Sequence, residues 1–273
     1  MKPTLIFLHL PKAAGTTLKS IIRRQYDADS IFVVDDAVID AFGETGWKSV
    51  SPMDRWKMAR SSFDALPENR KWEIDAVMGH MWFGWHELTP RPCTYVTILR
   101  DPIERAISHY RYMRRMKDHP VAEQIRDENI SLYAYFEKGL SSRFDNIQTK
   151  FLTGDFDPNE TATQTAISNL ETHFSVVGLL PVFDAALLQI ADEMDWPLPL
   201  YRRRNTAPKQ TRGDDVSEEA IAVIKDRNAL DLSVYDHVHE NMKSPARSVS
   251  TLALTRFKLS NWIYSSPLRR AFP

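Results

Sequence analysis

The stretch HLPKAAGTTL, from His9 to Leu18, decides the fold of this chain. It lies between an apolar run, Leu5 to Leu8, and a helix-like segment that begins near Thr16. This order predicts a strand, a tight loop and a helix. The first turn of a helix presents unpaired backbone N–H groups and the positive end of the helix dipole, so a loop with Lys12 in this position favours an anion. We therefore predict a phosphate or sulfate site, with an ordinary strand-to-helix turn as the alternative.

The loop differs from the Walker pattern G-x-x-x-x-G-K-[ST] of nucleotide triphosphatases. Lys12 precedes the single glycine, Gly15, and two threonines follow that glycine. In Walker loops the lysine and the neighbouring hydroxyl serve a magnesium-bound triphosphate, whereas the earlier lysine is placed to contact a bridging or leaving oxygen. The pattern therefore disfavours a standard nucleotide triphosphatase.

A second strand-to-helix segment reads YVTILRDPIERAISHYRYMRR. The apolar run from Tyr95 to Leu99 predicts a strand, and apolar residues at helical spacing follow it. Asp101 and Pro102 are explained as the N-cap and first residue of that helix. Arg100 and Ser108 are not explained in this way, and both are placed near the carboxyl ends of parallel strands, where open α/β sheets bind ligands. An arginine and a serine there suit a phosphate monoester.

The segments PKAAGTTL and RDPIERAISHY together resemble the two cofactor signatures of sulfotransferases that use 3′-phosphoadenosine 5′-phosphosulfate (PAPS). The resemblance is nearest to the Golgi heparan sulfate 2-O- and 6-O-sulfotransferases and their bacterial relatives. Weaker similarities follow in order up to about residue 240, in MGHMWFGWHEL, DNIQTKFLTG, VVGLLPVFDAALLQIAD, RRRNTAP and NALDLSVYDHV. The resemblance implies a P-loop-like, three-layer α/β/α fold with a central, mainly parallel sheet and helical insertions.

The resemblance also implies cofactor roles for individual residues. The second segment would hold the 3′-phosphate of PAPS through Arg100 and Ser108. A basic loop would close over the same side of the cofactor, and we expect Lys209 or Arg212 to act there, although its charges also suit a polyanionic glycan. The first loop would hold the 5′-phosphosulfate through Lys12, Ala13, Ala14, Gly15, Thr16 and Thr17.

Transfer to an acceptor hydroxyl requires a base, and His80 is the best-placed histidine. The strand-like residues 76–78 and a turn at Gly79 put it at the same sheet edge as the cofactor segments. The resemblance agrees, because the glycan-modifying members carry a catalytic histidine after their second or third strand. A structural role for His80 is the alternative, with His86 as the reserve base, whereas His9 is expected to support the loop. Lys12 would stabilise charge on the bridging oxygen.

The aromatic residues after His80 allow two interpretations. Trp82, Phe83 and Trp85 would form either a stacking wall for a sugar ring or part of the core. Large aromatic side chains are more often buried, so the core is favoured.

Composition bounds the class of protein. The 273 residues include 35 basic and 36 acidic side chains, and no run approaches the roughly 18 apolar residues of a membrane span. The first strand starts near Thr4, so we expect no signal peptide, no transmembrane segment and no nucleic-acid partner. Because the Golgi members of the resembling family carry a membrane anchor, we expect either a cytoplasmic protein or the trimmed catalytic part of an anchored one. Cys93 is the single cysteine, and no cluster at metal-ligand spacing is visible, so we expect no metal.

Periodicity places further helices at 53–66, 131–138, 160–172, 183–194 and 217–228, and strands at 31–34, 76–78 and 175–179. We expect one sulfotransferase domain over residues 1–242, with a helical insertion at 120–156. Residues 243–273 would form an arm that packs on this domain or on a partner subunit, the latter giving a homodimer. A membrane-surface role for this arm is the alternative, with packing favoured.

The predicted function is transfer of a sulfuryl group from PAPS to a hydroxyl, most simply of a carbohydrate or glycoconjugate. Two alternatives remain open. One is a P-loop phosphotransferase that uses ATP, and the other is a non-catalytic nucleotide- or glycan-binding protein.

Overall fold

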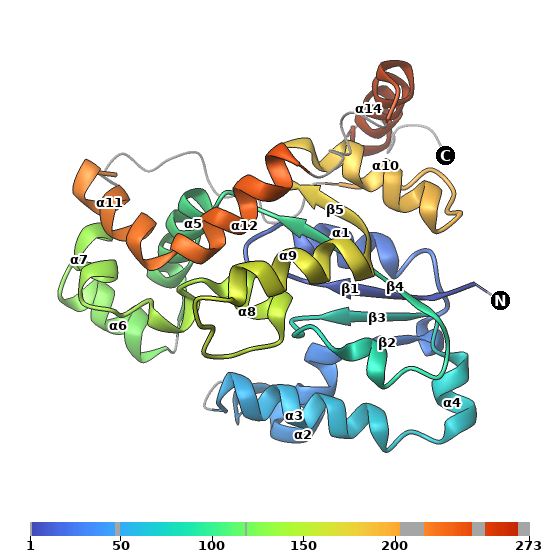
Figure 1. The fold of residues 1–273 in the computed structure, drawn as a ribbon, viewed down its shortest axis with the longest axis horizontal. Helices are drawn as coiled ribbons and strands as arrows, with labels where there is room; N and C mark the ends of the chain where they lie inside the picture. The colour runs from blue at the N-terminus through green and yellow to red at the C-terminus, as the bar shows by residue number, and fades with distance from the viewer. Residues whose placement is uncertain (1, 47–49, 118, 203–215, 242–248, 267–273) are drawn as a thin grey trace.

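The computed structural model describes residues 2–46, 50–117, 119–202, 216–241 and 249–266. Their centre is a five-stranded sheet in the order β2-β3-β1-β4-β5, with every neighbouring pair parallel. Helices cover both faces of this sheet (Figure 1). The strands are β1 (Thr4–Leu8), β2 (Ile31–Val33), β3 (Ala76–Gly79), β4 (Cys93–Leu99) and β5 (Phe174–Leu179). The predicted three-layer, P-loop-like α/β fold is confirmed.

The sheet is buried on both faces because its strands are apolar at successive positions. In β1, Ile6 and Leu8 join one core cluster, and Leu5 and Phe7 join the cluster on the opposite face. The first cluster includes residues of α3 (Pro52–Asp64), α8 (Ile147–Thr153), α9 (Ala162–His173) and α12 (Ala229–Glu240). The second includes residues of α1 (Gly15–Ile22), α10 (Phe183–Glu193) and α14 (Thr251–Ser265).

A third apolar cluster lies beside the sheet, where Tyr110 and Tyr135 are among its buried residues. It joins α5 (Pro102–Arg115), α6 (Pro120–Asp127), α7 (Leu132–Glu137) and α11 (Glu218–Arg227). The other helices are α2 (Val34–Gly46) and α4 (Glu68–Glu73), with single 3₁₀ turns at Ala28–Ser30, Trp85–Glu87, Ser142–Phe144 and Leu180–Val182. None of the described helices is long and apolar enough to cross a membrane.

The strands and helices predicted from periodicity are confirmed to within two residues. No helix was predicted at α2, α4, α12 or α14, and α2 begins at Val34, which had been assigned to a strand. Asp101 caps α5 as predicted, because its Oδ1 accepts the Glu104 N–H at 2.8 Å. The described part of the C-terminal arm packs on α10, where Phe257 is buried. The division into residues 1–242 and 243–273 stays a prediction.

Candidate active site

The carboxyl ends of β1, β3 and β4 meet at one edge of the sheet and open into a cavity of about 2170 Å³. Sequence-predicted site residues from three separate segments line this one cavity. They are Lys12, Ala13, Ala14, Gly15, Thr16, Thr17, His80, Arg100 and Ser108. Lys209 and Arg212 lie outside the described residues.

The loop between β1 and α1 has an unusual backbone. Lys12 and Ala14 adopt positive φ angles of 69° and 58°, which non-glycine residues rarely do outside functional loops. The N–H of Ala13 donates to the Leu10 carbonyl at 3.3 Å, and the N–H of Thr17 donates to the Ala14 carbonyl at 3.0 Å. These two amides, which were predicted to hold the anion, are therefore used within the loop. Among the described residues, the Ala14 and Gly15 amides have no partner and remain available for an anion.

Gly15 is required because the His9 imidazole lies directly against the first turn of α1. A Cβ atom at Gly15 would lie 1.7 Å from Cδ2 and Nε2 of His9, far inside contact distance. Burial lowers the pKa of His9 well below its ordinary value, and the nearby charges of His80 and Lys19 lower it further. His9 is therefore neutral near pH 7, and its position against the loop fits the supporting role predicted for it.

Lys12 and Arg100 bring two cations to the loop. The Lys12 ammonium lies 4.3 Å from the ring centroid of Tyr112, and burial, followed by repulsion from Arg115 and Arg100, lowers its pKa to about 8. Nη1 of Arg100 donates to the Lys12 carbonyl at 3.2 Å, and Nη2 lies 3.6 Å from Glu104. The Nε of Arg100 is buried and has no partner among the described residues. Both cations thus retain the capacity to bind an anion in the cavity.

A buried polar network holds Arg100 in place. The side chain of Gln148 accepts the Arg100 N–H and donates to the Arg100 carbonyl, both at 3.0 Å. Gln148 lies at the start of α8, where Asp231 accepts the backbone N–H groups of Gln148 and Thr149 at 3.2 and 2.7 Å. Asp231 is fully buried and lies 3.9 Å from Nε of Arg105. Two segments that showed only weak family similarity, those starting at residues 145 and 228, therefore support the residue predicted to bind phosphate.

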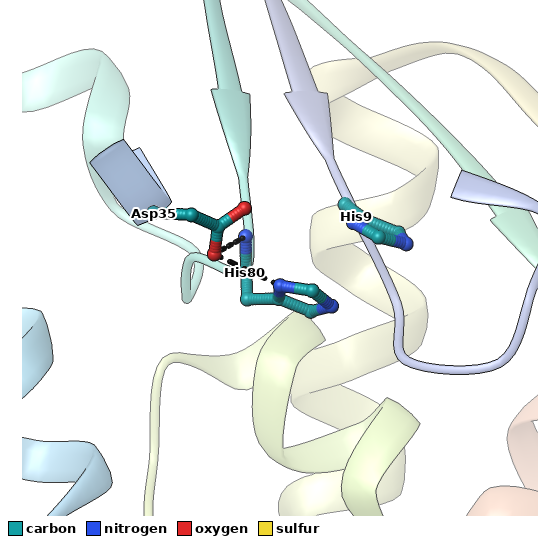
Figure 2. A group of neighbouring side chains, drawn as sticks. All are labelled: His9, Asp35 and His80. Carbon is teal, nitrogen blue, oxygen red and sulfur yellow. Dashed lines mark hydrogen bonds and ion pairs between the residues drawn. The ribbon is translucent and has the colours of Figure 1, made fainter. Parts of the chain in front are cut away.

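His80 follows β3 and pairs with Asp35 in the first turn of α2 (Figure 2). Gly79, with φ of 149°, allows this approach, because a Cβ there would lie 2.9 Å from Cβ of Val34 and 3.2 Å from the Asp35 nitrogen. Nδ1 of His80 lies 2.9 Å from Oδ1 of Asp35, and the His80 N–H reaches the same oxygen at 3.3 Å. The Lys19 ammonium donates to the other carboxylate oxygen at 2.9 Å.

These contacts set the charge of Asp35. Burial alone would raise the pKa of Asp35, but the charges and hydrogen bonds of His80 and Lys19 hold it far below its ordinary value. Asp35 is therefore an ionised acceptor, so Nδ1 of His80 carries the proton of their hydrogen bond, and Nε2 is the ring nitrogen left to face an acceptor hydroxyl. The His80 side chain is 41% exposed, so a substrate in the cavity has access to it. This arrangement is that of a general base with an orienting carboxylate.

Sequence reasoning missed Asp35. The available signal was the acidic pair at residues 35 and 36, directly after the predicted strand that ends beside Gly79. Asp35, His80 and His9, whose ring is tilted by 34° against that of His80, also offer ligand atoms that all lie within 4.8 Å of one another. The structure thus brings together a possible metal-ligand set that no spacing in the sequence showed.

The reserve base and the aromatic wall are not supported. His86 is outside the set of described residues that line the cavity, and its N–H and Nδ1 both contact the Tyr95 hydroxyl at 3.0 Å. Trp85 is fully buried against Phe32, Trp56 and Phe63, so it belongs to the core.

One aromatic residue of the set does line the cavity. Trp82 stacks on Phe156 with ring centroids 3.6 Å apart, and both rings are cavity residues. Phe83 instead packs against His86, Tyr95 and His173. Trp82 is only 5% exposed and also stacks on Phe151, so its ring belongs to the core although it borders the cavity.

The fold and cavity define an α/β protein with a cationic loop at a helix N-terminus and a histidine–carboxylate pair beside it. The chain belongs to the galactose-3-O-sulfotransferase family, whose model matches residues 1–256. This confirms the sulfotransferase family predicted from the sequence, and it shows that the resemblance to the heparan sulfate enzymes was only approximate.

Curated relatives agree with this family. The chain is 26% identical over 177 residues to galactosylceramide sulfotransferase of Bos taurus, a match that covers 60% of this chain and 42% of the relative. It is 27% identical over 177 residues to galactose-3-O-sulfotransferase 3 of Mus musculus, covering 59% and 41%. Each match thus spans less than half of the relative's length. Among solved structures, the chain is similar to mouse sulfotransferase SULT7A1 complexed with PAP, with a TM-score of 0.38, 14% identity, and coverage of 99% of this chain and 81% of that one.

Proposed function

We propose that this protein is a PAPS-dependent O-sulfotransferase whose acceptor is a hydroxyl of a galactoside or another carbohydrate or glycoconjugate. Membership of the galactose-3-O-sulfotransferase family supports this activity and this acceptor class. The observation that carries the proposal is the shared cavity, where the cationic loop and the His80–Asp35 pair lie at neighbouring strand ends.

The residues present fit the charged ends of PAPS, which supplies the sulfuryl group. The amides of Ala14 and Gly15, which find no partner in the described part of the chain, would hold the 5′ end together with the Lys12 ammonium. Arg100, with its buried and unpartnered Nε, would hold the 3′-phosphate together with Ser108.

The chain's own residues account for proton removal. Nε2 of His80 takes the acceptor proton, and Asp35 stabilises the imidazolium that results. Neutral His9, whose ring centroid lies 4.1 Å from that of His80, adds no charge against this step. Lys12 stabilises negative charge that develops on the leaving oxygen.

We also propose that the reaction requires no metal. The Lys19 ammonium already neutralises Asp35 at 2.9 Å, and its charge opposes a divalent cation in the cluster of His9, Asp35 and His80. EDTA should leave turnover unchanged. Loss of turnover with EDTA, restored by Mn²⁺ or Zn²⁺, would contradict this part of the proposal and give the cluster a metal-binding role.

The first test is calorimetric titration with 3′-phosphoadenosine 5′-phosphate (PAP), beside 5′-AMP and ATP, without added metal. Micromolar binding of PAP with much weaker binding of 5′-AMP is expected, because Arg100 and Ser108 face the 3′-phosphate in this proposal. A preference for ATP with magnesium-dependent turnover would favour a phosphotransferase instead.

The second test is transfer of labelled sulfate from PAPS to a panel of β-galactosides, with glucosides as matched acceptors. Transfer to the galactosides is expected. Binding of PAP without transfer to any acceptor would favour a non-catalytic binding protein. The cytoplasmic location and a homodimer stay predictions, which fractionation and light scattering would test.

A further inference from the structure

Helix α14, Thr251–Ser265, has two different faces. On its inner face Phe257 is buried, and Asn261 accepts the Tyr201 N–H at 2.7 Å. On its outer face four large apolar side chains are exposed to between 53% and 63%. They are Leu252, Leu259, Trp262 and Ile263, which we call the α14 apolar stripe. Figure 1 shows α14 at the periphery of the molecule, beyond α10.

The stripe lies along one side of the helix. With 3.6 residues per turn, Leu252, Leu259 and Ile263 fall within an arc of about 40° on the side of the helix away from Phe257, and Trp262 flanks them. Single exposed apolar residues are common, but four within residues 252–263 form a patch of the kind that marks an interaction surface.

The charges of α14 identify the partner. Arg256 and Lys258 are both exposed, Arg256 lies beside the stripe, and residues 251–265 contain no acidic side chain. A second copy packed helix to helix would bury Arg256 against the same basic helix, with no carboxylate on that helix to pair with it. A bilayer surface accepts Leu, Ile and Trp at the acyl boundary, while basic side chains extend to lipid phosphates.

We propose that α14 docks the protein in the plane of an anionic lipid bilayer through this stripe. Arg256 and Lys258 supply the attraction to the charged surface, and the apolar side chains, with Trp262 at the interface, supply the insertion. The inner face keeps its contacts with the body through Phe257 and Asn261. This binding does not depend on the sulfotransferase activity.

The test is flotation of the full chain with vesicles of phosphatidylcholine, either alone or mixed with phosphatidylglycerol. Binding to the anionic vesicles should be about 30-fold tighter, since each basic residue near such a surface contributes about fivefold. The double variant Arg256→Gln, Lys258→Gln should lose this preference.

Apolar insertion is tested by the double variant Trp262→Ser, Ile263→Ser, which should bind anionic vesicles at least about tenfold more weakly. Its matched control is Trp72→Ser, because Trp72 is also exposed, at 46%, but lies on α4. The control should bind like the wild type, and all variants should keep the wild-type melting temperature, since the changed side chains point outward.

Three outcomes would overturn the proposal. In the first, the wild type binds neither kind of vesicle. In the second, the variant Trp262→Ser, Ile263→Ser binds anionic vesicles as tightly as the wild type does. In the third, the control Trp72→Ser loses as much vesicle binding as that double variant. Light scattering that shows a dimer dissolved by Trp262→Ser, without vesicle binding, would assign the stripe to a second copy instead.

Discussion

Replacing Asp35 with asparagine tests the proposed base most directly. Asparagine keeps the shape of the side chain but removes the charge that holds Nδ1 of His80 at 2.9 Å. A hydrogen bond to a charged group contributes about 1.5–3 kcal/mol, and this bond strengthens as His80 becomes an imidazolium. Because 1.36 kcal/mol corresponds to a tenfold change in rate, kcat should fall by about 10- to 150-fold.

The assay is sulfate transfer at saturating PAPS and acceptor, with PAP affinity measured by calorimetry on the same preparations. Affinity should stay within about twofold of the wild type, because Asp35 is assigned to the base and not to the cofactor loop. Asp36→Asn is the matched control, since Asp36 is the next residue and pairs with Arg23 on the surface at 3.3 Å. Its kcat should not change, because exposed ion pairs contribute little.

Two results would refute this reasoning. One is an Asp35→Asn variant with wild-type kcat and a wild-type melting temperature, which would mean that His80 needs no carboxylate or is not the base. The other is a loss of PAP affinity as large as the loss of kcat, which would make the residue part of the cofactor site. Lys19 loses its half-buried partner in this variant, so the melting temperature must accompany each measurement.

The remaining predictions concern the loop and its support. The pKa of Lys12 is lowered to about 8, so its positive charge is present below that pH and is lost above it. We therefore expect kcat/KM to fall as the pH rises through about 8. The variant Lys12→Arg should remove this fall, because an arginine keeps its charge. Arg100→Ala should weaken PAP binding by tenfold or more and leave 5′-AMP binding unchanged. Ser108→Ala should weaken PAP binding less in the same titrations. Equal PAP affinities in the wild type and both variants would contradict the assignment of these residues to the 3′-phosphate. Asp231→Ala should lower the free energy of unfolding by about 3–5 kcal/mol in urea titration, because it leaves Arg105 buried without its carboxylate; a loss under about 1 kcal/mol would show that the pair is not a structural support.

Much of the fold could be predicted because it is encoded in short stretches. Apolar runs and helical spacing located the strands and the five helices assigned from periodicity, and Asp101 with Pro102 marked the start of α5. The anion loop was recognisable because strand, lysine, glycine and helix follow one another without interruption. Each of these signals depends on neighbours in the chain, so no knowledge of strand order was needed.

The rest depended on contacts between distant segments. Asp35 could not be assigned to His80 until β2 and β3 were known to be adjacent and parallel. Trp82 and Trp85 are both buried in one core cluster, yet of the two only Trp82 borders the cavity, because it stacks on the cavity residue Phe156 whereas Trp85 packs on Phe32.

The amino-acid sequence by itself determined the strands, the five helices assigned from periodicity, the position of the cationic loop and the broad class of PAPS-dependent sulfotransferases. Only the tertiary structure decided which carboxylate orients His80, which loop amides remain free, and that Asp231 and Gln148 hold Arg100. The reason is physical: local conformation follows from the periodicity of neighbouring side chains, whereas a catalytic pair or a buried polar network forms between residues that only long-range packing brings within hydrogen-bond distance.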